Sequence, residues 1–277
     1  MDSAASLQIS IPIVTIEAAA VLLLITMPVA VGLGYMVGSY RRKSATASGD
    51  DVDPAIVDTT LTAILALLGL LLAFSFSNAL TIAQAKKTAL ANEAAALGTA
   101  FLRADLLQEP GRSELKVALI DYTRTRILPE DTKLTSQQEA RTFLEKSLAV
   151  QSRLWPVTLA ATADPTPVPI KTYVATGIEE AFNAHVYRMS SLSHQVSNLS
   201  KLMMLAAAFA ALFLIGNGVG ASGRRLTWRV FVISGFLAIV MFATLDTERS
   251  YEGFVRIDDG LLRATLLEMQ MNLSNGS

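Results

Sequence analysis

The sequence predicts an all-α membrane protein with four transmembrane helices, whose long helices extend into a helical domain outside the membrane. Hydrophobic residues make up 52% of the 277 residues and charged residues only 17%, which is low for a soluble protein. Two pairs of long apolar segments flank a polar middle region. No segment alternates apolar and polar residues in the manner of a strand beyond chance.

The first pair of predicted spans lies within residues 1–83, joined by a short basic loop. The first span covers about 13–37. A signal peptide is disfavoured, because the N-terminal region carries Asp2 but no Lys or Arg and the apolar run is too long. The second span begins at Asp53-Pro54, an N-cap acceptor followed by proline at the first helical position.

The second span is apolar from 57 to 80, and no proline interrupts the turns that follow. From Ala83 its residues change from Leu and Phe to Ala, Lys and Glu, all of which favour helix. We therefore predict one continuous helix to about Leu107. About 55 residues at ~1.5 Å each would reach roughly 80 Å, which joins the membrane to the outer domain.

The region 84–198 is predicted to be a helical stalk domain. Pro110-Gly111 ends the long helix, and further helices are predicted over 112–128 and 135–155. A proline-rich linker precedes a fourth helix that begins at Ile170. Because no strong breaker occurs before Gly216, this helix is predicted to run unbroken into the third span.

The second pair of spans lies within 199–246, as the apolar runs 202–221 and 230–245. The tail 247–277 is predicted to form an amphipathic helix from Asp258, with apolar residues at helical spacing: Leu261, Leu262, Leu266 and Met269.

Small residues recur at intervals of four in the first and third spans. Such spacing favours close packing of membrane helices. A dinucleotide-binding loop is disfavoured, because these glycines follow a membrane helix and not a strand. The residues concerned are Ala30, Gly34 and Gly38 in one span and Gly216 and Gly220 in the other.

The positive charges predict the orientation of the chain in the membrane. One short loop contains Arg41, Arg42 and Lys43, and the other contains Arg224 and Arg225. Short loops rich in Lys and Arg stay in the cytoplasm. The middle domain, the N-terminus and the tail are therefore predicted on the outer side of the membrane.

Composition and motifs exclude several functions. A net charge of −1 gives no reason to expect nucleic acid, and the absence of cysteine excludes disulfides and thiolate zinc sites. No Walker loop, metalloprotease helix or nucleophile elbow occurs, so we expect neither an enzyme nor a cofactor. His185 and His194 lie too far apart for a helical metal pair, and we interpret them as polar helix-face residues.

Two sets of acidic residues leave alternatives open. Asp50, Asp51 and Asp53 form either a solvated loop with an N-cap or a cation site. Glu17 lies near the start of an apolar span, where a carboxylate either sits at the interface or marks an ion path.

The second span is the best candidate for a pore helix. Leu70 and Phe74 are large apolar residues one turn apart, which could form a hydrophobic gate. Leu67, Ser77 and Thr81 continue that stripe. The alternative is an ordinary helix–helix interface. Polar Asn78 lies beside the stripe, and Lys86 and Lys87 follow within two turns, where a ring of copies would attract anions.

Several segments together resemble the bacterial bestrophin-like family, a domain family thought to be distantly related to bestrophin anion channels. The resemblance covers about 55–265 and is most specific at Glu93–Asp105. It implies a four-span protomer in a ring, commonly a pentamer, with the second span lining a pore. The segments are 70–80, 92–107, 122–127, Trp155, 183–188 and 245–253.

Two features depart from that family. Bestrophins carry an arginine after the phenylalanine of the pore helix, whereas this chain has Ser75, so ion selectivity does not carry over. The soluble domain of bestrophins is cytoplasmic, which is opposite to the orientation predicted from the basic loops.

We therefore expect a homo-oligomeric ion channel of the bacterial inner membrane that prefers anions to cations. Its middle domain is expected on the periplasmic side. Its expected partners are other copies of the chain, membrane lipids and inorganic ions. The alternative is a non-conducting membrane sensor or scaffold whose helical stalk binds a partner.

Overall fold

The computed structural model describes residues 15–48, 54–128, 137–163, 165–193, 196–248 and 258–275. Within these ranges it contains eight α-helices, a 3-10 turn and no strand. The predicted fold class, all-helical with four spans, is confirmed.

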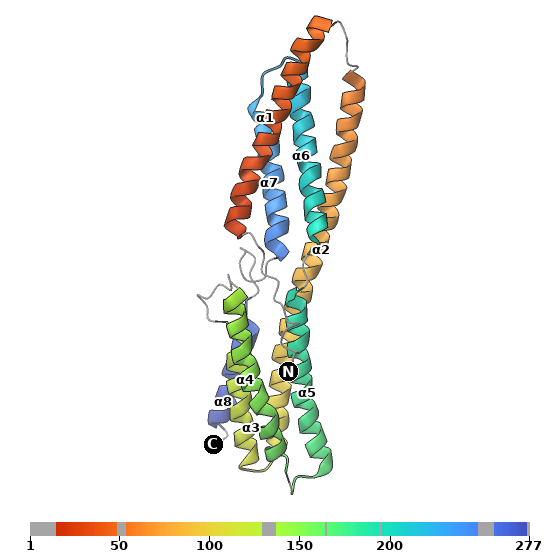
Figure 1. The fold of residues 1–277 in the computed structure, drawn as a ribbon. Helices are drawn as coiled ribbons and strands as arrows, with labels where there is room; N and C mark the ends of the chain where they lie inside the picture. The colour runs from red at the N-terminus through yellow and green to blue at the C-terminus, as the bar shows by residue number, and fades with distance from the viewer. Residues whose placement is uncertain are drawn as a thin grey trace.

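The helices form two layers stacked end to end (Figure 1). The helix α2 (Pro54–Arg103) runs through both layers. The membrane layer also contains α1 (Ile16–Ser48), α6 (Asn198–Ala221) and α7 (Trp228–Glu248). The stalk layer contains α3 (Gly111–Thr125), α4 (Gln137–Ala161), α5 (Val168–Ser193) and α8 (Gly260–Asn275).

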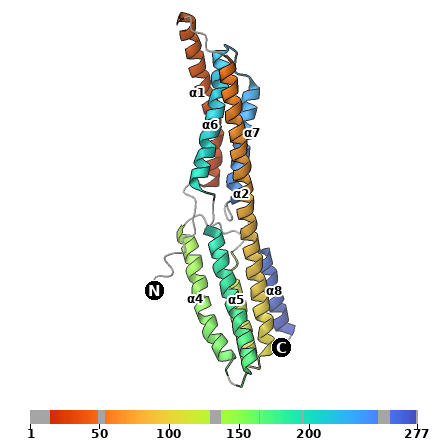
Figure 2. The same cartoon turned by 90° about the vertical axis from the view of Figure 1, so that its right-hand side faces the viewer.

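The long helix α2 confirms the prediction of continuity. It begins at Pro54, and its 50 residues at ~1.5 Å each span roughly 75 Å. A 3-10 turn over Ala104–Leu106 ends it, just before the predicted end. Figure 2 shows α2 leaving the membrane layer without a break and continuing between α5 and α8.

The prediction of one unbroken helix from Ile170 to Gly216 is wrong. The helix α5 ends at Ser193, and α6 begins at Asn198. Ser197 has φ −53° and ψ 135°, and its hydroxyl accepts a hydrogen bond from the backbone N–H of Leu199 at 3.3 Å. Ser197 is therefore the N-cap of a new helix.

The helix α4 also differs from its prediction, because it passes Pro156 and ends at Ala161. A proline inside a helix removes one backbone hydrogen bond. Leu154 and Ala161, on either side of Pro156, are both buried in the stalk core, and this packing holds the last turns in helical form. The predicted start of this helix at Thr135 lies outside the described residues.

The predicted close packing through small residues is confirmed between α1 and α6. Gly34 and Gly38 of α1, and Gly216 and Gly220 of α6, each lie so close to the opposite helix that an added methyl group would overlap its backbone atoms. Ala30 on the same face is fully buried. The two helices therefore pack backbone against backbone.

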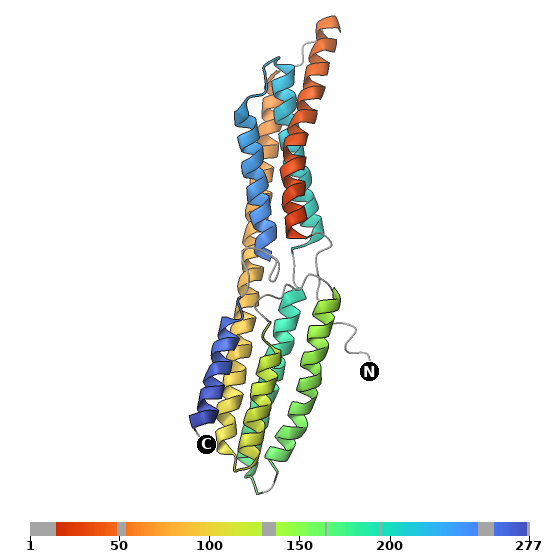
Figure 3. The same cartoon turned by 90° about the vertical axis from the view of Figure 1, so that its left-hand side faces the viewer.

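The stalk has its own hydrophobic core, to which α2, α3, α4, α5 and α8 contribute. The predicted amphipathic tail is α8, which lies along α2 and α3 (Figure 3). It buries Leu262 and Met269 and leaves Leu261 54% exposed. The tail is thus a structural part of the stalk.

Candidate functional site

The membrane part of α2 is the least covered of the four spans. In its most apolar stretch only 6% of residues are buried by the rest of the chain, compared with 28–33% in the other spans. It contacts α6 and α7 at one edge of the membrane layer (Figure 1). Most of its surface is therefore not covered by the other helices of this chain.

The predicted stripe on α2 lies on this uncovered surface. Leu70 is 53% exposed and Phe74 is 67% exposed, and Ser77 and Asn78 follow them on the surface. The opposite face, with Leu68, Ser75 and Ala79, is buried. This placement is compatible with a pore-lining role and with an interface between copies.

The uncovered stripe continues along α2 into the stalk. This continuation was not predicted from the sequence. From Phe74 to Leu102, exposed residues recur at alternating steps of four and three. This is the 3.5-residue spacing with which helices face a common axis. Between the apolar ends the residues are small or polar: Asn78, Thr81, Ala85, Thr88, Asn92, Ala95 and Thr99.

The two lysines predicted at the mouth of a pore are separated by the structure. Lys86 is only 3% exposed and lies on the inner face of α2, whereas Lys87 is exposed. Lys86 precedes the buried Glu93 by two turns, so both belong to the face of α2 that packs against the other helices of the chain. Only Lys87 lies where it could meet an ion from solution.

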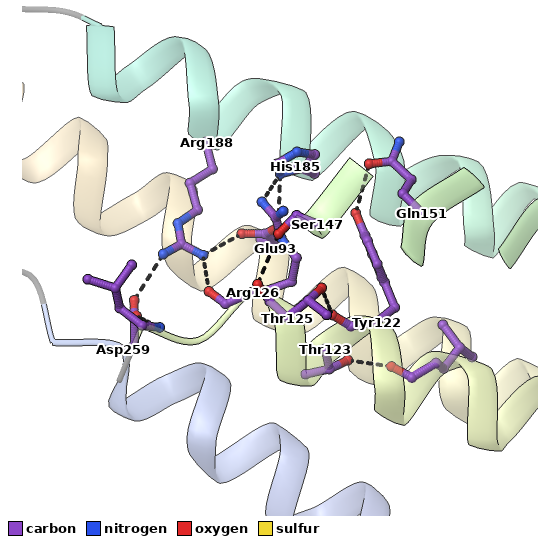
Figure 4. Close-up of polar contacts among 12 residues, drawn as sticks. Glu93, Tyr122, Thr123, Thr125, Arg126, Ser147, Gln151, His185, Arg188 and Asp259 are labelled. Atoms are coloured by element: carbon purple, nitrogen blue, oxygen red, sulfur yellow. Dashed lines mark hydrogen bonds and ion pairs between the residues drawn. The ribbon is translucent and has the colours of Figure 1, made fainter. Parts of the chain in front are cut away.

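A buried ionic cluster surrounds Glu93 in the stalk (Figure 4). The carboxylate of Glu93 is fully buried and accepts hydrogen bonds from Arg126 at 3.0 Å and from Arg188 at 2.8 Å. Nδ1 of His185 lies 3.3 Å from the same carboxylate and also accepts a hydrogen bond from Arg126. Arg188 continues to Asp259 at 2.9 Å.

The cluster joins elements that are far apart in the sequence. Asp259 accepts the backbone N–H of Leu128 at 2.9 Å, and Arg263 of α8 donates to the Leu128 carbonyl at 3.0 Å. Together with Glu93 of α2 and Arg188 of α5, these contacts tie the end of α3 and the start of α8 to α2. The cluster therefore holds the stalk around the candidate pore helix.

Burial and neighbouring charges set the ionisation of the cluster. Burial alone would raise the pKa of Glu93, but the neighbouring positive charges of Arg126 and Arg188 hold that pKa well below its usual range. Burial lowers the pKa of His185, which Glu93 opposes only in part. Glu93 is therefore charged and His185 neutral near pH 7.

Among the other candidates, His185 is 2% exposed, so its interpretation as a helix-face residue is wrong. Its position on α5, one turn before Arg188, directs it inward toward Glu93. His194 and the acidic residues 50–53 lie outside the described residues. Glu17 is exposed in the first turn of α1. Within the described ranges, no group of three or more His, Asp or Glu could hold a metal ion.

The chain matches one family profile and is similar in fold to known crystal structures. The profile of the bestrophin-like domain matches residues 26–260. A crystal structure of a mutated bacterial bestrophin homolog from Klebsiella pneumoniae matches with a TM-score of 0.63 and 10% identity, covering 91% of this chain and 98% of that chain. Another structure of the Klebsiella homolog matches with a TM-score of 0.60 and 12% identity, covering 90% and 96%. No curated protein matches the chain.

Proposed function

This chain belongs to the bestrophin-like family, and from that premise we propose that it forms a homo-oligomeric ion channel whose pore is lined by α2. The uncovered stripe of α2 carries the proposal. A surface that faced only lipid would have no need of Ser77 and Asn78, and the stalk half of the stripe lies beyond the apolar span. If copies of α2 surround a common axis, both the membrane half and the stalk half of the stripe face that axis.

The proposed assembly is a closed ring, for which the family implies a pentamer. A ring uses a head-to-tail interface between two different surfaces of each protomer. In the stalk, α2 contacts α5 on one flank and α8 on the other (Figure 2). With α2 toward the axis, these two flanks lie toward the neighbouring copies.

The proposed gate consists of Leu70 and Phe74, whose side chains would narrow and dry the pore. Ser77 and Asn78 provide polar groups beyond this constriction. Lys87 is the surface cation next along α2. It lies on a flank of the helix and not on the stripe, so in a ring of copies it would favour anions over cations through its electrostatic field and not by lining the pore. Substitution of Lys87 by glutamate is expected to lower the preference for anions.

The protein spans the membrane several times, and for its orientation we propose the arrangement that the basic loops predict. The stalk then projects into the periplasm and the loops after α1 and α6 face the cytoplasm.

Single cysteines test the pore-lining role, because the natural chain contains none. Leu70→Cys, Phe74→Cys and Ser77→Cys place a thiol on the uncovered stripe, whereas Leu68→Cys and Ala79→Cys place it on the buried face as matched controls. A charged, membrane-impermeant thiol reagent should change ion flux in liposomes only for the first three. Equal sensitivity of both faces, or no effect at either, would contradict the pore-lining role and favour a scaffold.

A further inference from the structure

Five arginines gather at the end of the membrane layer that is opposite to the stalk. The helix α1 continues past Gly38 to Ser48, and its last turns carry Arg41 and Arg42. The connection from α6 to α7 and the first turn of α7 carry Arg224, Arg225 and Arg229. All five are exposed. Figure 1 shows the end of α1 and the α6–α7 connection at the same end, and we call these five residues the basic rim.

Backbone geometry fixes the position of the basic rim. Gly223 has a φ of +67°, a conformation that favours glycine and ends α6. The N–H of Gly223 donates to the carbonyl of Gly220 at 3.1 Å, and the N–H of Arg224 donates to that of Val219 at 3.3 Å. The guanidinium of Arg42 lies so close to Gly223 that a Cβ there would overlap it. The turn thus places Arg42 beside the residue that precedes Arg224.

Four of the five arginines have no acidic partner within the described part of the chain. There, Arg41, Arg224, Arg225 and Arg229 make no ion pair with a carboxylate. Asp50, Asp51 and Asp53 lie outside the described residues. These four exposed cations, with no carboxylate of the described residues bonded to them, favour a negatively charged ligand.

Two aromatic residues locate the basic rim at the surface of the membrane. Tyr40 is 74% exposed and precedes Arg41, and Trp228 is 69% exposed and precedes Arg229. Exposed Tyr and Trp at the ends of spans lie at the level of the lipid headgroups. The arginines are therefore within reach of lipid phosphates, which guanidinium groups bind through paired hydrogen bonds.

We propose that the basic rim binds the phosphate headgroups of anionic phospholipids. This role is independent of whether the protein conducts ions. Each arginine near an anionic lipid surface strengthens binding by about fivefold, so two arginines together contribute about 25-fold. The site would anchor the end of the bundle that carries the α1–α6 glycine contact.

The test measures how dioleoylphosphatidylglycerol raises the melting temperature of the purified protein in detergent, with dioleoylphosphatidylcholine as the neutral lipid. The rim variant carries Arg224→Gln and Arg225→Gln. The matched control carries Arg141→Gln and Arg153→Gln, which remove the same charge from exposed positions on α4 in the stalk. The half-saturating concentration of the anionic lipid should rise about 25-fold in the rim variant and stay unchanged in the control.

Three results would overturn the proposal: unchanged lipid dependence in the rim variant, an equal rise in the control, or equal stabilisation by the neutral lipid. Protection of the wild type by inorganic phosphate at the same concentration as the lipid would indicate a free-anion site and also overturn it. If the rim variant does not fold, the single variant Arg229→Gln replaces it in the test. The half-saturating concentration of the anionic lipid should then rise about fivefold, and no rise would overturn the proposal.

Discussion

Replacing Glu93 with glutamine would remove the negative charge between Arg126 and Arg188 while keeping the shape of the side chain. Arg126 is 1% exposed and Arg188 is 3% exposed, so neither guanidinium can recover its interaction with water. Arg188 keeps Asp259, but Arg126 loses the carboxylate to which it is bonded. Removing one partner of a buried ion pair costs about 3–5 kcal/mol of folding free energy.

A matched control is available on the surface of the stalk. Arg141 and Glu145 form a pair one turn apart on α4, with side chains 75% and 63% exposed. Glu145→Gln makes the same chemical change there, and an exposed pair of this spacing contributes only about 0.3–0.5 kcal/mol.

Thermal melting of the purified variants in detergent, followed by circular dichroism, compares the two changes. A loss of about 3–5 kcal/mol corresponds to a fall of roughly 10 °C for a domain of this size. We expect that fall for Glu93→Gln and almost none for Glu145→Gln. If both variants melt together with the wild type, the buried cluster does not hold the stalk around α2.

Three further predictions concern pH, packing and orientation. Because burial lowers the pKa of His185, the unfolded chain takes up a proton below pH ~6.5 that the folded chain does not, so stability should fall from pH 7 to pH 5. His185→Gln should reduce this slope in a series of melting curves; an unchanged slope would contradict the assignment. Gly216→Ala should lower the melting temperature because its methyl meets the backbone of α1, whereas Gly218→Ala meets no atom within 4 Å and should not; equal effects would contradict that packing. A reporter active only in the periplasm should be active after Ser277 and silent near Ser44, and the reverse pattern would refute the proposed orientation.

Local signals were sufficient for much of the fold. The course of α2 could be predicted because proline placement and residue propensities act within a few turns. The glycine contact of α1 with α6 could be predicted because small residues at intervals of four have a direct packing consequence. The break before α6 was missed because Ser197 is one of several serines in that stretch, and only its backbone conformation distinguishes it as the N-cap.

The buried cluster could not be assembled from local patterns. Glu93 meets Arg126 across 33 positions in the sequence and Arg188 across 95, and no helical period connects them. A signal did exist on α2, because Glu93 shares a helix face with Leu90 and Leu97, which are both buried. Lys86 lies on that same face, so the helical spacing from Glu93 predicts that Lys86 is buried and Lys87 is exposed.

Ion flux through purified protein in liposomes tests most directly the proposal that α2 lines a pore. The wild type should conduct anions better than cations, and Phe74→Ala should raise the flux, because a smaller side chain widens and hydrates the constriction. The size of the oligomer, measured on the same preparation, must stay unchanged for this comparison. An intact Phe74→Ala oligomer with wild-type flux would contradict the gate at Phe74. Absence of flux in the wild type with every ion and pH tested would contradict the proposed channel function and favour the alternative, a non-conducting sensor or scaffold.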